Sequence, residues 1–167
     1  MALTARERLY LENALEQIAL AGAAARALHY SYQRRPESRV DQTYDEAEWE
    51  RWDALTARFA RLADLLTQRV FRAIDRAEFL PPEATFIDRL NHAEKRGHIR
   101  STYTWKEIRE VRNQIVHEYA SKDILALLQD VVQHTPELLA CAQQVCEYAG
   151  VIRARLDESA HALPNAD

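Results

Sequence analysis

Arg112 and His117 are the two side chains whose types and spacing suggest chemistry. They stand in the run Arg112-Asn113-Gln114-Ile115-Val116-His117-Glu118-Tyr119. An arginine can bind a phosphate through two hydrogen bonds and stabilise the charge that develops on it, and histidine as a residue type exchanges protons near neutral pH. Together the two residues suit cleavage of RNA through the ribose 2′-hydroxyl, a reaction that needs no metal ion and that DNA cannot undergo.

The helix that should carry this run is amphipathic. At about 100° per residue, its apolar side chains fall on one arc; they are Trp105, Ile108, Val111, Ile115, Val116 and Tyr119. Arg112 lies in the middle of this arc, where an unpaired guanidinium would cost several kcal/mol, so an anion must meet it. If that anion is a carboxylate such as Asp88 or Asp123, Arg112 could have a purely structural role.

A neighbouring row of the same helix carries Arg109, Asn113 and His117 at steps of four, so these side chains can support one another. Asn113 could orient His117 or bind a phosphate. Arg112 and His117 are five residues apart, about 140° around the axis, and do not share a face of a regular helix. A twofold axis could bring an arginine and a histidine from each of two chains into one cleft.

The residues from about Thr102 to Asp123-Ile124 resemble the HEPN superfamily, and within it the HepT-like toxins that are paired with minimal nucleotidyltransferases. The family signature is an arginine, a polar residue, three further residues, a histidine, any residue and a tyrosine, which Arg112, His117 and Tyr119 match. The resemblance implies a HEPN-like antiparallel helical bundle that is homodimeric. It also implies a toxin-like, metal-independent endoribonuclease without a cofactor, which cleaves single-stranded RNA at the dimer seam with Arg112 and His117 as catalytic residues.

The same resemblance implies a partner. In HepT-like toxins a minimal nucleotidyltransferase antitoxin attaches AMP to the tyrosine of the signature, which would be Tyr119 here, and so neutralises the toxin. Some HEPN relatives are instead non-catalytic companions that bind nucleotide or substrate for a nucleotidyltransferase. The sequence leaves that alternative open, together with a purely structural helical adaptor.

Composition predicts an all-α fold of five or six helices in a single domain over residues 1–167. The chain is 47% hydrophobic, which is enough for a core, and its three glycines leave little material for β turns. A formal charge of -4 argues against a generally basic surface, so RNA contacts should be local. There is no apolar run of membrane-spanning length and no signal peptide, which predicts a cytoplasmic protein. His92 and His98 do not form a zinc motif, and no metal site is predicted.

The first helix should begin at a capping box, Thr4 to Glu7, and has an alanine-rich face between positions 19 and 27 that could be a core seam or a dimer seam. A polar loop is expected at about 33–44. Its arginines, Arg34, Arg35 and Arg39, should be solvated, with RNA-backbone contact as the alternative. The second helix should run from Asp45 to about Arg76 and place its tryptophans in the core.

A third, short helix should end at Gly97 in a left-handed cap. The signature helix should begin at a second capping box, Thr104 to Glu107, and close near Tyr119 or Ala120. The last helical stretch should begin at Asp123 and either kink or restart at Thr135-Pro136. A frayed tail is expected over about 158–167. Cys141 and Cys146 should be free thiols that are buried or half-buried.

Overall fold

A computed structural model describes residues 3–39, 43–80, 84–117 and 124–161. Within these ranges every regular element is helical and no strand is present, which confirms the predicted all-α class. The elements are α1 (Ala5–Gln33), α2 (Glu46–Asp64), the π-helical segment η1 (Leu65–Val70), α3 (Phe71–Ala77), α4 (Phe86–Lys95), α5 (Thr102–His117) and α6 (Ile124–His161).

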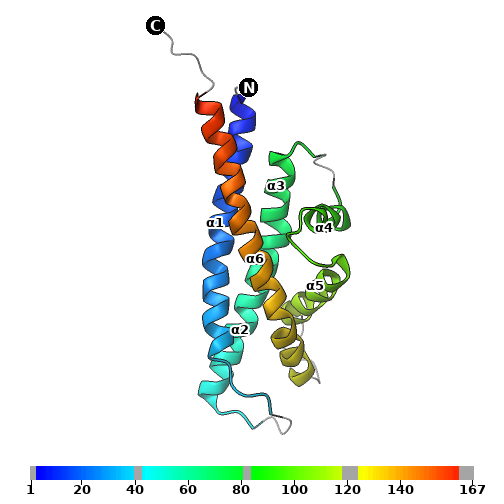
Figure 1. Ribbon diagram of the computed structural model, residues 1–167. Helices are drawn as coiled ribbons and strands as arrows, with labels where there is room; N and C mark the ends of the chain where they lie inside the picture. The colour runs from blue at the N-terminus through cyan, green and yellow to red at the C-terminus, as the bar shows by residue number, and fades with distance from the viewer. Residues whose placement is uncertain (1–2, 40–42, 81–83, 118–123, 162–167) are drawn as a thin grey trace.

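Three long rods form the body of the molecule (Figure 1). α1 and α6 lie side by side over most of their length, and α2, η1 and α3 follow one another without a break as a third rod that packs on both. α4 and α5 are shorter, cross the outside of the third rod and contact each other. The beginning of α1 meets the end of α6, where the backbone N–H of Leu3 donates to Ser159 Oγ at 2.8 Å.

α6 extends further than predicted and is not interrupted at Pro136. Residues 158–161 belong to the helix instead of a frayed tail, because Ser159 is buried and holds the beginning of the chain. Of the two alternatives predicted at Pro136, a kink or a restart, the restart is wrong, because the helix continues through the proline. The hydroxyl of Thr135 donates to the carbonyl of Val131 at 2.6 Å, and packing on α1 along the length of α6 outweighs the one backbone hydrogen bond that proline lacks.

The predicted second helix is a single rod, but its middle is not α-helical. In η1 the N–H of Phe71 donates to the carbonyl of Leu66, five residues back, which is the π-helical pattern. The hydroxyl of Thr67 donates to the carbonyl of Ala63 at 2.7 Å and so competes for the acceptor that its own N–H would use in an α-helix. The wider turn accommodates one extra residue, so side chains beyond it are rotated relative to a regular helix.

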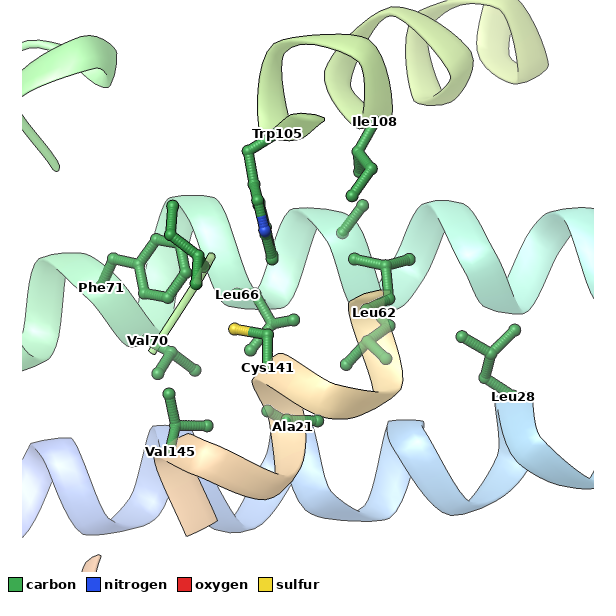
Figure 2. Close-up of a cluster of buried hydrophobic side chains, with 14 of the residues drawn as sticks. Ala21, Leu28, Leu62, Leu66, Val70, Phe71, Trp105, Ile108, Cys141 and Val145 are labelled. Atoms are coloured by element: carbon green, nitrogen blue, oxygen red, sulfur yellow. The ribbon is translucent and has the colours of Figure 1, made fainter. Parts of the chain in front are cut away.

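The core lies where the three rods and α5 meet. Figure 2 shows Trp105 and Ile108 of α5 pointing toward Leu66 of the third rod and Cys141 of α6. All four are at most 1% exposed. Trp52 is also 1% exposed, which confirms the predicted core role for that tryptophan. Cys141 and Cys146 are free thiols; Cys141 is buried as predicted, whereas Cys146 is exposed.

A buried polar cluster fixes α4 and the turn after it against α3 and α6. Arg96 pairs with Asp75 at 2.8 Å and with Glu78 at 2.7 Å, and Glu78 also accepts a hydrogen bond from the hydroxyl of Tyr148. Desolvation by burial, followed by the bond to Glu78, raises the pKa of Tyr148 to about 12. Such a network favours one orientation of α4, because moving it would leave buried charges unpaired.

The capping predictions for α1 and α4 are confirmed. Thr4 and Glu7 form the expected capping box. Gly97 has φ of 74°, and the N–H of His98 reaches back to the carbonyl of Ala93 at 2.9 Å, so the left-handed cap after α4 is a Schellman motif. α5 begins at Thr102, two residues before the predicted Thr104, because the Ser101 hydroxyl accepts from the N–H of Thr104 at 3.4 Å.

The alanine-rich face of α1 is partly a core seam. Ala21 is fully buried, and a Cβ added at Gly22 would stand 3.2 Å from Cys146 Sγ of α6, so the two helices approach closely there. Ala23 on the other side of α1 is exposed. No helix in the described ranges is long and apolar enough to cross a membrane. One domain over residues 1–167 and a homodimeric state stay predictions.

Candidate functional site

α5 carries Arg112 and His117 of the signature and is held by its apolar stripe. Trp105, Ile108, Val111 and Ile115 are buried, as predicted from their helical spacing. Val116 was predicted to join them but is 52% exposed, because the stripe is narrower than the arc assumed for it. The stripe packs on α2 and α6, so the azimuth of every other side chain on α5 is fixed by the core.

Arg112 meets the anion that its position required, and that anion is Asp64. Its Nε lies 2.8 Å from Oδ1 of Asp64, and its Nη2 donates to Oδ2 at 2.8 Å, so both carboxylate oxygens are engaged. Asp88 was suggested as the partner, but its carboxylate caps α4 by accepting from the N–H and hydroxyl of Thr85. Asp123, the other suggestion, lies outside the described residues.

A cavity of about 690 Å³ opens beside this ion pair. One wall is the α2–η1 rod, the other is α5, and Phe86 of α4 closes one side. Four arginines line it, Arg61 and Arg69 from the rod and Arg109 and Arg112 from α5, against the single carboxylate of Asp64. The cavity is therefore a locally cationic place in an acidic chain, as any RNA contact would require.

The two supporting residues of the prediction also line this cavity. Asn113 accepts a hydrogen bond through Oδ1 from Nη1 of Arg112 at 3.3 Å. The guanidinium carbon of Arg109 stands 4.3 Å from the centre of the Phe86 ring, a cation–π contact that leaves its N–H groups at the cavity. The structure thus brings Arg109, Arg112 and Asn113 together.

His117 is not brought to this cavity within one chain. It is exposed in the last turn of α5, five residues and about 140° beyond Arg112, and α5 is regular up to that point. The described residues contain no partner for its ring. Tyr119, the predicted site of modification, lies outside the described residues. In the described part of the chain no three histidine, cysteine or carboxylate side chains gather in a way that could hold a metal ion.

Sequence reasoning missed Asp64, Arg61 and Arg69. The helical period of α2 places Asp64 off the apolar stripe, where it resembles any solvated acid, and only the packing of α2 on α5 pairs it with Arg112. The demand for an anion at Arg112 was the one signal that pointed to such a residue. It gave the chemistry of the partner but not its position.

The comparisons with known proteins identify a family. The model of one protein family, described as "Ribonuclease HepT-like", matches residues 37–145, which is more than half of the chain and includes Arg112 and His117. No curated protein sequence matches the chain. From the family match we conclude that this chain belongs to the HepT-like ribonuclease family.

Proposed function

We propose that the protein is a metal-independent endoribonuclease that cleaves single-stranded RNA at a composite site on a homodimer seam. The observation that carries the proposal is the cationic cavity at Arg112 in a chain of the HepT-like ribonuclease family. Family membership supports RNA as the substrate, and Arg112 with Arg109 beside it can supply the contacts that the scissile phosphodiester needs.

In the proposed reaction His117 takes the proton of the ribose 2′-hydroxyl. The 2′-oxygen then forms a bond to phosphorus while the bond from phosphorus to the 5′-oxygen breaks, and the 5′-oxygen receives a proton from the His117 of a second copy. The products are a 2′,3′-cyclic phosphate and a free 5′-hydroxyl. Arg112 contacts the phosphate oxygens and stabilises the charge that accumulates on them in the transition state.

The position of His117 supports a site built by two chains. An exposed histidine on a different azimuth from Arg112 contributes nothing to the cavity of its own chain. A twofold seam near the end of α5 would place the histidine of one chain by the arginine of the other. Neutralisation by a nucleotidyltransferase antitoxin that attaches AMP to Tyr119 belongs to the same proposal, because bulky anionic groups near Arg112 would exclude RNA.

The test is cleavage of a labelled single-stranded RNA in EDTA by wild type, Arg112→Ala and His117→Ala. Both variants should lose activity by at least about 100-fold, the usual contribution of one acid–base group for His117 and of one group that stabilises transition-state charge for Arg112. His117→Ala should melt like wild type, because the side chain is exposed. Mixed dimers of wild type and His117→Ala, unfolded and refolded together, should be far less active than wild-type dimers, because the proposed reaction uses the His117 of both chains. Equal cleavage by wild type and variants would overturn the proposal.

One observation favours a second candidate function, a non-catalytic companion that binds nucleotide for a nucleotidyltransferase. Asp64 already neutralises Arg112 in the free protein, as in a site whose arginine serves structure. The same RNA assay separates the two functions. Wild-type protein that binds a nucleotide but leaves RNA intact would favour the companion.

A further inference from the structure

Arg61 and Arg69 are two exposed cations without a role in the reaction described above. Both line the cavity beside Arg112, and no ion pair or hydrogen bond holds either guanidinium in the described part of the chain. Both also line an adjoining hollow of about 370 Å³, where the rod faces the small side chains Ala23 and Ala27 of α1. They therefore stand on the ridge between two adjoining depressions.

The π-helical segment is what aligns them. Two residues eight apart in a regular α-helix are turned by about 80° relative to each other. η1 begins at Leu65, between the two arginines, and includes Arg69; its wider turn rotates the chain by less than 100° per residue, which brings the angle between the two side chains below 80°. The two side chains then project from nearly the same side of the rod, which agrees with their sharing both depressions.

The charges on this ridge are not compensated. Asp64 is the one carboxylate at the cavity, and Arg112 uses both of its oxygens. Arg58, which lines the second hollow, has its Nη1 bound to the carbonyl of Ala27 at 3.1 Å and to Ser31 Oγ at 2.6 Å. Arg61 and Arg69 remain as the cations that an incoming anion meets without first breaking a protein contact.

A row of free cations that leads away from Arg112 fits one class of ligand, a single-stranded polyanion. We propose that Arg61 and Arg69 bind phosphodiesters that flank the scissile phosphate, so that the RNA strand runs from the cavity over the ridge toward the hollow beside α1. This inference rests on the proposed function, because it takes the phosphate at Arg112 to be the scissile one. It assigns Arg61 and Arg69 to substrate binding and not to the chemical step.

The first test is the salt dependence of binding to a single strand of 2′-O-methyl RNA, which cannot be cleaved. Each phosphate contact contributes about 0.7 to the slope of log affinity against log salt for a single strand. The double variant Arg61→Gln/Arg69→Gln should therefore reduce the slope by about 1.4. The matched control is Arg51→Gln/Arg153→Gln, which removes two exposed arginines that line neither depression and should leave the slope at the wild-type value.

The second test is cleavage by the same proteins. The double variant should raise KM for a long RNA severalfold and leave kcat unchanged, and it should cut a dinucleotide as wild type does, because a dinucleotide has no flanking phosphate. If wild type cleaves RNA while the double variant keeps the wild-type salt slope and KM, the phosphate contacts of Arg61 and Arg69 are refuted. The proposed ribonuclease activity is then still supported. If wild type neither binds nor cleaves RNA, both proposals fail. If the double variant has a smaller salt slope than wild type but wild type does not cleave RNA, the result would support RNA binding at Arg61 and Arg69 and refute the ribonuclease activity.

Discussion

The ion pair between Arg112 and Asp64 should lower the affinity of the free protein for RNA. A phosphate that binds Arg112 has to compete with a carboxylate that engages Nε and Nη2 at 2.8 Å each. Asp64→Asn removes the negative charge and keeps the shape of the side chain. We therefore expect this substitution to weaken the fold slightly and to strengthen RNA binding, two effects of opposite sign from one contact.

Exposure sets the size of both effects. The side chains of Arg112 and Asp64 are 28% and 43% exposed, so the pair resembles a surface ion pair and contributes about 1 kcal/mol at most. Its loss should lower the melting temperature by about 2–4 °C for a domain of this size. Released from the carboxylate, Arg112 should bind a phosphate up to about fivefold more tightly, the equivalent of about 1 kcal/mol.

The assay combines thermal melting with fluorescence anisotropy on a labelled 2′-O-methyl single strand. Glu50→Gln is the control, because it removes the same charge from an exposed position on α2 that does not line the cavity. The reasoning is refuted if Asp64→Asn weakens RNA binding as much as Arg112→Ala does. That result would mean that Asp64 holds Arg112 in its binding conformation and does not compete with the phosphate.

Two further predictions concern stability. Burial, followed by the charge of Arg96, lowers the pKa of His98 from 6.5 to about 4. Between pH 6.5 and pH 4 the imidazole is therefore protonated in the unfolded chain but neutral in the folded chain. The free energy of unfolding should therefore fall by up to about 3 kcal/mol from pH 6.5 to pH 4, and urea titrations of His98→Leu should show a smaller fall; an equal fall in both would exclude His98 as its cause. Gly97→Ala should lower the free energy of unfolding by about 1 kcal/mol because φ is 74° there. Gly150→Ala, at an exposed helical position, should raise it by about 0.5–1 kcal/mol. Melting temperatures that shift in the same direction for both variants would contradict this backbone argument.

Local signals in the sequence predicted the local structure. The capping box at Thr4 and the glycine at position 97 each satisfy backbone groups within a few residues, so no distant contact could overturn them. The same holds for the apolar stripe of α5, whose period fixed the buried side. The prediction that Val116 is buried was wrong because this residue lies at the edge of the apolar stripe. Only the packing of the neighbouring helices decides which residues at that edge are buried.

The site could be predicted only in part, because it depends on how separate helices meet. Arg112 had to find an anion, which follows from the cost of burying a guanidinium, but the choice of Asp64 needs the packing of α2 on α5. The alignment of Arg61 with Arg69 could not be predicted at 3.6 residues per turn, since the π-helical segment that begins between them and includes Arg69 changes the period. The bond from the Thr67 hydroxyl to the Ala63 carbonyl, which competes with the α-helical pattern there, is a single side-chain contact that the period does not reveal.

The state of each arginine in the free protein implies an order of binding if the proposals hold. Arg61 and Arg69 are not paired with a carboxylate at the cavity, so they can bind a phosphodiester strand at first contact. Arg112 is engaged by Asp64, so a phosphate displaces that carboxylate more readily when it is already held nearby at high effective concentration. Because the whole chain is acidic, a strand that misses the ridge is repelled. An isolated phosphate should therefore bind this cavity far more weakly than a strand does, and the difference should vanish when Arg61 and Arg69 are replaced.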